Sequence, residues 1–103
     1  NRIQELTAGI ELDRARLAMV VAIYADKSDI NEELVRLERL LQQLLQILIL
    51  DEPIGRKLDF IIQELNREIN TVGSKANDLK IAQIVINFKS ELEKIREQIQ
   101  NIE

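Results

Sequence analysis

The 103-residue chain contains no cysteine and no histidine. Without cysteine it has no disulfide and no thiolate nucleophile, which fits a reducing compartment such as the cytoplasm. Without histidine it has no imidazole base or metal ligand, so catalysis of the Ser-His-Asp type is excluded. Any metal bound here would take oxygen ligands, as Mg²⁺ and Mn²⁺ do. Gly-rich phosphate loops, GxSxG, HExxH and EF-hand patterns are also absent.

Glycine, proline and aromatic residues are scarce, while Leu, Ile, Glu, Lys, Arg and Gln dominate. This composition favours helix over sheet, and the length suits one small domain spanning residues 1–103. The net charge of -4 is not typical of a nonspecific DNA-binding protein, so we expect no DNA partner. The longest apolar stretch, residues 40–50, is broken by three glutamines and is too short to span a membrane.

Aliphatic residues recur every three or four positions in four segments, which is the spacing of one buried helix face. We therefore predict an all-α antiparallel bundle of about four helices, arranged as two helical hairpins with coiled-coil-like seams. The predicted core residues are Ile3, Leu6, Ile10, Leu17, Val20 or Val21, and Tyr24; Leu34, Leu37, Leu41, Leu44 and Leu48; Leu58, Ile61 or Ile62, Leu65, Ile69 and Val72; and Ile81, Ile84, Phe88, Leu92, Ile95, Ile99 and Ile102.

Turn-forming and polar residues predict the helix boundaries. The first stripe is interrupted at Asp13 and Arg14, where its packing is hardest to predict. Asn31 is expected to cap the second helix, and Pro53 suits the first turn of the third. Gly73 and Ser74 are expected to end the third helix. A single long helix kinked at Gly73 is the alternative for the second half of the chain.

The second helix carries more apolar residues than one buried stripe needs. The additional residues are Leu45, Ile47, Ile49 and Leu50. Two interpretations remain open: a central helix buried on several sides, or an interface for a second chain or a further domain.

The third helix has a broad polar face, although Asn costs up to ~0.7 kcal/mol relative to Ala within a helix. Helical spacing places its polar residues in two adjoining stripes with Arg67 between them. One stripe contains Asp59, Gln63, Asn66 and Asn70, and the other contains Glu64, Glu68, Thr71 and Lys75. This face is either a solvated surface with intrahelical ion pairs or a set of groups placed to bind a polyanion.

Three segments of the chain resemble those of a known protein family. They are ADKSDINEELVRL (25–37), GRKLDFIIQELNREINTVGSKAND (55–78) and ELEKIREQIQNIE (91–103). Together they resemble the C-terminal region of the YicC/YloC family, with similarity from about Leu17 to Glu103. That family is similar to stress-induced, cytoplasmic bacterial endoribonucleases. The resemblance implies a ring-shaped homo-oligomer, expected to be a hexamer, that cuts RNA with Mn²⁺ or Mg²⁺. It also implies an N-terminal domain that this chain lacks.

The resemblance assigns roles to residues that match the family's motif. The implied catalytic residues are Glu64, Glu68 and Asn66, the implied metal ligands are Asp59, Glu64 and Glu68, and the implied RNA-binding residues are Arg67, Asn70, Thr71, Ser74 and Lys75. The terminal motif is matched by Glu97, Gln98, Asn101 and Glu103. Carboxylates can hold a divalent ion or act as a base, and Arg and Lys can pair with phosphate oxygens. The Asn amides can orient water or read ribose and base edges.

The chain also departs from the family pattern. Leu40 stands where relatives usually carry a histidine, and Val20 stands where they usually carry a glutamate. Together with the apolar residues of 40–50, these changes fit a divergent homologue or a domain redesigned to fold alone. The chain starts at Asn1, which favours a C-terminal fragment of a longer protein. A catalytically inactive helical scaffold or assembly domain is therefore the alternative function.

Overall fold

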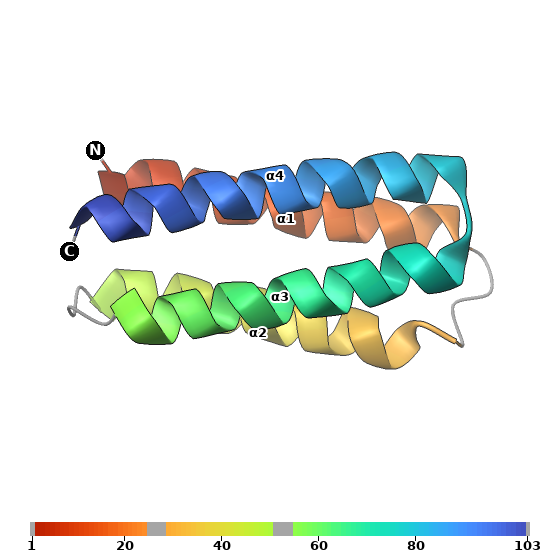
Figure 1. The fold of residues 1–103 in the computed structure, drawn as a ribbon, viewed down its shortest axis with the longest axis horizontal. Helices are drawn as coiled ribbons and strands as arrows, with labels where there is room; N and C mark the ends of the chain where they lie inside the picture. Colours follow the sequence, from red (N-terminus) through yellow and green to blue (C-terminus); the bar gives the residue numbers. More distant parts are fainter. Residues whose placement is uncertain (1, 25–28, 51–54, 103) are drawn as a thin grey trace.

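The structure is a computed structural model that describes residues 2–24, 29–50 and 55–102. These residues form four α-helices and no strand. The helices are α1 (Arg2–Ile23), α2 (Asn31–Leu50), α3 (Gly55–Ala76) and α4 (Leu79–Ile102). Successive helices run in opposite directions along the 40 Å length of the molecule (Figure 1). The predicted all-α antiparallel bundle of four helices is confirmed.

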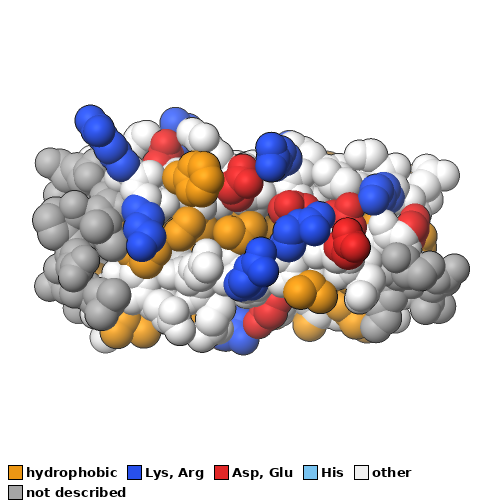
Figure 2. Space-filling model, turned by 90° about the horizontal axis from the view of Figure 1, so that it is seen from below, with side chains coloured by type: hydrophobic (Ala, Val, Ile, Leu, Met, Phe, Trp, Pro, Cys, Tyr) orange, Lys and Arg blue, Asp and Glu red, His pale blue; other side chains and the backbone are white. Residues whose placement is uncertain are grey.

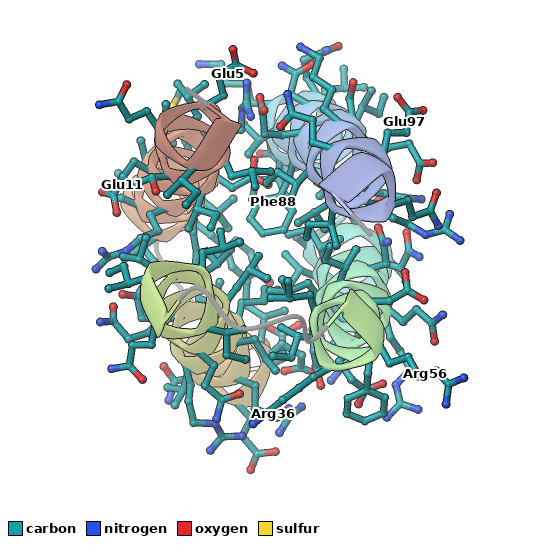
Figure 3. All side chains as sticks on the ribbon, turned by 90° about the vertical axis from the view of Figure 1, so that its left-hand side faces the viewer. Glu5, Glu11, Arg36, Arg56, Phe88 and Glu97 are labelled. Atoms are coloured by element: carbon teal, nitrogen blue, oxygen red, sulfur yellow. The ribbon has the colours of Figure 1, made fainter. Side chains whose placement is uncertain are left out.

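Each helix packs against two neighbours, so the four helices stand at the corners of a square (Figure 3). α1 and α3 each contact α2 and α4, and neither diagonal pair is in close contact. Side chains from all four helices fill the centre of the square, among them the ring of Phe88. No helix in the described part of the chain combines the length and apolar character needed to cross a membrane.

The aliphatic stripes predicted from the sequence form the core. Every predicted core residue of α2 and α3 is buried, including both Ile61 and Ile62, as are those of α4 from Ile81 to Ile99. Ile3 differs, with 39% of its surface exposed, because it lies in the first turn at the end of the bundle, where it has fewer neighbours. Burial of these stripes supplies the main favourable free energy of folding.

The extra aliphatic residues of α2 differ in how far they are buried. Ile47 is buried and Leu45 packs partly against the core, whereas Ile49 is 67% exposed. The side chain of Leu50 lies outside the described residues. Because α2 has only two neighbours, it is not a central helix, and Ile49 remains on the surface.

The connection between α3 and α4 lies later in the chain than predicted. α3 continues through Gly73 and ends at Ala76, so the prediction that Gly73 and Ser74 end the helix was wrong. Asn77 supplies the left-handed residue of this turn, with φ of 50°. Asp78 Oδ1 then accepts hydrogen bonds from the backbone N–H groups of Lys80 and Ile81, at 2.8 and 3.1 Å. This N-cap starts α4 in the opposite direction, which excludes the single kinked helix.

The start of α2 differs by one residue from the predicted cap. α2 begins at Asn31, and the carbonyl of buried Ile30 accepts the first helical hydrogen bond, from Leu34 N at 3.0 Å. Ile30 therefore has the cap position that we expected for Asn31. The prediction for Pro53 lies outside the described residues.

Where Asp13 interrupts the aliphatic stripe of α1, the structure has a buried polar cluster between α1 and α4. Asp13 occupies a core position and is fully buried. Its Oδ1 accepts a hydrogen bond from Arg16 Nη1 at 2.8 Å, while its Oδ2 has no hydrogen-bond partner among the residues that the structure describes. The same Arg16 nitrogen lies 3.4 Å from Oε1 of Glu91 on α4. Gly9 allows this approach, because a Cβ there would lie 2.8 Å from Glu91 Oε2.

Burial raises the pKa of Asp13 from 3.8 to about 7, since the charged carboxylate loses its hydration. The hydrogen bond and charge of Arg16 oppose this rise in pKa, and the negative charge of Glu91 adds to it. The folded chain therefore holds a proton on Asp13 that the unfolded chain has already released near pH 5.

We predict that this proton makes stability depend on pH. The folded-state pKa is raised, so the free energy of unfolding should fall as pH rises from about 4 to about 7 and then level off. The absence of histidine leaves few other groups that titrate at the upper end of this range. Asp13→Asn should reduce the slope and stabilise the fold by about 1–3 kcal/mol near pH 8.

Urea unfolding at a series of pH values measures this effect. Glu97→Gln is the matched control, because Glu97 is exposed and has no hydrogen-bond or ion-pair partner among the described residues. Equal slopes for the original chain and Asp13→Asn would contradict the prediction.

Candidate functional site

The first polar stripe of α3 faces α4. Asp59 Oδ1 accepts a hydrogen bond from Arg96 Nε at 3.0 Å, and its Oδ2 accepts one from Gln63 Nε2 at 3.3 Å. About three helical turns further along the same stripe, Asn70 Oδ1 accepts a hydrogen bond from Lys89 Nζ at 2.9 Å. These polar groups join α3 to α4 through the partners that α4 supplies.

The second polar stripe of α3 faces α2. Glu68 is 13% exposed and accepts two hydrogen bonds from Arg36, from Nε at 2.8 Å and from Nη2 at 3.2 Å. Lys75 Nζ donates to Glu33 Oε2 at 2.8 Å and to the carbonyl of Asp29 at 3.2 Å. The hydrogen bond from Lys75 lowers the pKa of Glu33, and the bond to Glu33 raises the pKa of Lys75. Both pairs join α3 to α2.

Three predicted site residues between these flanks remain available to a ligand. The Arg67 side chain is 73% exposed, and its Nη2 lies 3.3 Å from Glu64 Oε1. Glu64 is itself partly exposed, so this pair is weakly held. The amide of half-exposed Asn66 has no hydrogen-bond partner in the described part of the chain. Glu64, Asn66 and Arg67 therefore form the accessible middle of the predicted site.

The two predicted hydroxyl groups donate within α3 itself. Thr71 Oγ1 donates to the carbonyl of Arg67 at 3.1 Å, and Ser74 Oγ donates to the carbonyl of Asn70 at 2.8 Å. A phosphate oxygen needs a donor, so neither hydroxyl can bind it without giving up its bond to the helix.

The three predicted metal ligands are not brought together. Asp59 and Glu68 are about two and a half helical turns apart, so they point to opposite flanks of α3. Residues 2–24, 29–50 and 55–102 contain no group of three or more acidic side chains that could hold a metal ion. Glu64 and Glu68 lie one turn apart and form the closest predicted pair. Two carboxylates fit a Mg²⁺ or Mn²⁺ site that is completed by water and substrate phosphate, and do not fit a complete protein cage.

The terminal motif lies away from the face between α2 and α3. Glu97 points outward from α4 on the opposite side of the bundle (Figure 3). Gln98 Nε2 donates to Glu5 Oε2 on α1 at 3.2 Å. The side chains of Asn101 and Glu103 lie outside the described residues.

The two positions at which the resemblance led us to expect a glutamate and a histidine hold packed apolar side chains. Val20 is fully buried in the core, and Leu40 is partly buried against it. Both side chains therefore add to the apolar packing of the bundle.

Sequence reasoning did not find the partners of the α3 residues, which are Glu33, Arg36, Lys89 and Arg96. A signal for two of them exists. In an antiparallel hairpin, residues about equally far from the connection face each other, and Arg36–Glu68 and Glu33–Lys75 both meet this condition around residues 51–54. Opposite charges at such positions predict ion pairs across the seam.

Comparison with known proteins identifies the family. A family model described as "Endoribonuclease YicC-like, C-terminal" matches residues 1–103. The chain belongs to this family. A Clostridioides difficile (strain 630) protein named "Probable endoribonuclease YicC" is 60% identical over 92 residues, which are 89% of this chain and 31% of the relative. A Haemophilus influenzae protein of the same name is 41% identical over 96 residues, covering 93% of this chain and 33% of the relative.

These comparisons confirm the resemblance seen in the sequence. They also show that the YicC-like chain spans about a third of the length of the curated relatives it matches. The site described above is therefore the site of one domain, a C-terminal domain of the YicC-like family.

We predict that Glu68 and Glu64 differ in their effect on stability. Glu68→Gln should lower the melting temperature by a few degrees, because it weakens a two-bond pair between helices at a nearly buried carboxylate. Glu64→Gln should leave the melting temperature almost unchanged, since its exposed partner is screened by water. Thermal unfolding at low and high salt measures both. If Glu64→Gln lowered the melting temperature more than Glu68→Gln, the pair between Arg36 and Glu68 would not be the stabilising contact.

Proposed function

We propose that this chain is the C-terminal domain of a metal-dependent endoribonuclease and that its α2–α3 face contacts the RNA. The observation that carries the proposal is the exposed guanidinium of Arg67 in the middle of a polar helix face, where its one partner among the described side chains is a weak pair with Glu64. A guanidinium in such a position can exchange its carboxylate for a phosphate, with which it forms bidentate hydrogen bonds. Membership in the YicC-like family supports RNA as the source of that phosphate.

The accessible residues divide the chemistry among them. Arg67 would bind a phosphate oxygen and hold the backbone in place. Asn66 would orient a water molecule or a ribose hydroxyl through its free amide. With Arg67 turned to the phosphate, the Glu64 carboxylate would be available to accept a proton, and Glu64 and Glu68 would be the residues that hold a divalent ion. A bound Mn²⁺ or Mg²⁺ would neutralise charge on the phosphate oxygens.

This domain does not supply a complete site in the proposal. The described acidic residues provide two neighbouring carboxylates, and the chain has no histidine to act as a general acid. The remaining groups would come from the other two-thirds of a protein the length of the relatives, or from further subunits of a homo-oligomer. The face between α2 and α3 would then form one wall of an RNA channel.

A chimera tests the catalytic proposal. This chain would replace the matched segment of the Clostridioides difficile relative, and the chimera would be incubated with end-labelled structured RNA and Mn²⁺, Mg²⁺ or a chelator. We expect cleavage that the chelator abolishes. Glu64→Gln combined with Arg67→Gln should slow cleavage by about 100-fold or more, because it removes a phosphate contact and a carboxylate.

Lys94→Gln provides the control for a general loss of positive charge, since Lys94 is exposed on α4 and has no partner in the described part of the chain. Cleavage at the original rate by the Glu64→Gln, Arg67→Gln chimera would remove these residues from the catalytic assignment.

A helical scaffold is the second candidate function. It is favoured by the use of Asp59, Glu68 and Lys75 in pairs between helices, where they stabilise the bundle. On this hypothesis the chimera folds and reaches the same oligomeric state as the relative, measured by light scattering, but leaves RNA intact. Cleavage by the chimera would exclude a purely structural role.

A further inference from the structure

The seam between α2 and α3 opens into a pocket near the 51–54 end of the bundle. Its volume is about 270 Å³. The residues that line it are Gln43, Gln46 and Ile47 of α2 and Lys57, Phe60 and Ile61 of α3. Figure 2 shows this face: hydrophobic side chains gather along the seam in its left half, whereas acidic and basic side chains alternate along its right half.

The pocket combines an apolar interior with polar groups that are free. Ile47 and Ile61 are buried and form its floor, while Phe60 is 62% exposed at its edge. The side chains of Gln43, Gln46 and Lys57 are exposed and have no hydrogen-bond or ion-pair partner among the described residues. Further along the same seam, Arg36 and Lys75 are committed to Glu68 and Glu33. The open end of the seam therefore retains unused donors, acceptors and one positive charge.

The pocket adjoins the accessible middle of the candidate site. Phe60, Glu64 and Arg67 follow one another at intervals of four and three residues, so they lie on one face of α3. Seven residues of helix place Phe60 about 10 Å from Arg67 along the axis. That separation is within reach of neighbouring nucleotides of a single strand. Lys57 lies in the first turn of α3, where the helix dipole adds to its positive charge.

We propose that this pocket binds one unpaired nucleobase of an RNA strand whose phosphate lies at Arg67. The inference rests on the proposed function and adds that the domain selects single-stranded positions. The base stacks on the ring of Phe60, and the amides of Gln43 and Gln46 hydrogen bond to its edge. Lys57 pairs with the adjoining phosphate. An exposed aromatic ring beside free amides and a cation is the combination with which proteins bind splayed-out bases.

An apolar protein segment is the competing occupant, and the chemistry of the pocket disfavours it. A protein segment would desolvate the two Gln amides and the Lys57 ammonium without matching their hydrogen bonds. A nucleobase offers donors and acceptors on its edge, and its phosphate offers a negative charge. The difference between stacking and simple apolar contact also gives a direct test.

The test is an NMR titration of the isotopically labelled 103-residue chain with three RNAs. These are a short single-stranded oligomer, the same oligomer with abasic positions, and a fully paired duplex. The single strand should shift the ring signals of Phe60 and the side-chain amide signals of Gln43 and Gln46. The abasic strand and the duplex should bind about 5- to 100-fold more weakly, the range expected for loss of one stacked base.

Substitutions at Phe60 separate stacking from apolar contact. Phe60→Tyr keeps a flat ring and should retain affinity, whereas Phe60→Leu and Phe60→Ala should each lose about 5- to 100-fold. Ile86→Ala is the matched control, because Ile86 is exposed to a similar degree on α4, away from the pocket. Circular dichroism would verify that all four variants are folded.

Several results would overturn the subsite. These are equal binding of the abasic and intact oligomers, full affinity of Phe60→Leu, or a change in sedimentation of Phe60→Ala without RNA, which would make the pocket a protein interface. The proposed function fails separately. If Phe60→Leu does not affect RNA binding while the chimera still cleaves RNA through Glu64 and Arg67, only the subsite is wrong. If stacking is found but the Glu64→Gln, Arg67→Gln chimera still cleaves, only the catalytic assignment is wrong.

Discussion

Packing of the aliphatic stripes of α2 and α3 against the common core fixes the register of these two helices, and the surface chemistry depends on that register. Leu37 and Leu65 are both fully buried, so neither helix can rotate without exposing apolar surface. With the stripes in place, Arg36 lies beside Glu68 and Glu33 lies beside Lys75. The ion pairs are therefore a consequence of core packing, and they add a smaller stabilisation to the register that the core sets.

The polar face of α3 serves two purposes in this arrangement. Its flanks are committed to α2 and α4, while its middle and the open end of the seam face solvent with groups still available. A helix that binds a polyanion needs both conditions, because charges on a mobile helix would lose the geometry that gives them specificity. Asp59 and Glu68 hold α3 in place through their pairs with Arg96 and Arg36, which keeps the exposed middle of the face in one orientation.

The fold could be predicted from the sequence because it depends on a repeating pattern. The spacing of aliphatic residues identifies the inner face of each helix, and it did so for nearly every core position. The same spacing does not show which neighbouring helix lies beside each flank of α3. It therefore could not predict that Asp59 pairs with α4 and Glu68 with α2. The end of α3 was misplaced because Gly73 resembles a terminator, while Asn77 and Asp78 make the actual turn. Asp13 was recognised as an irregularity, but the spacing could not predict that it is buried with Arg16 bonded to it and Glu91 of α4 nearby.

The close contact between Gly9 and Glu91 determines how closely the first and last helices can pack. Any side chain at position 9 would meet a carboxylate that Arg16 holds, and the methyl end of Ile95 lies 3.4 Å away on the same side. An alanine at position 9 would require the end of the Glu91 side chain to turn aside, which would disturb its contact with Arg16. Gly9 therefore lets α1 and α4, the first and last helices, approach closely beside the buried Asp13–Arg16 pair.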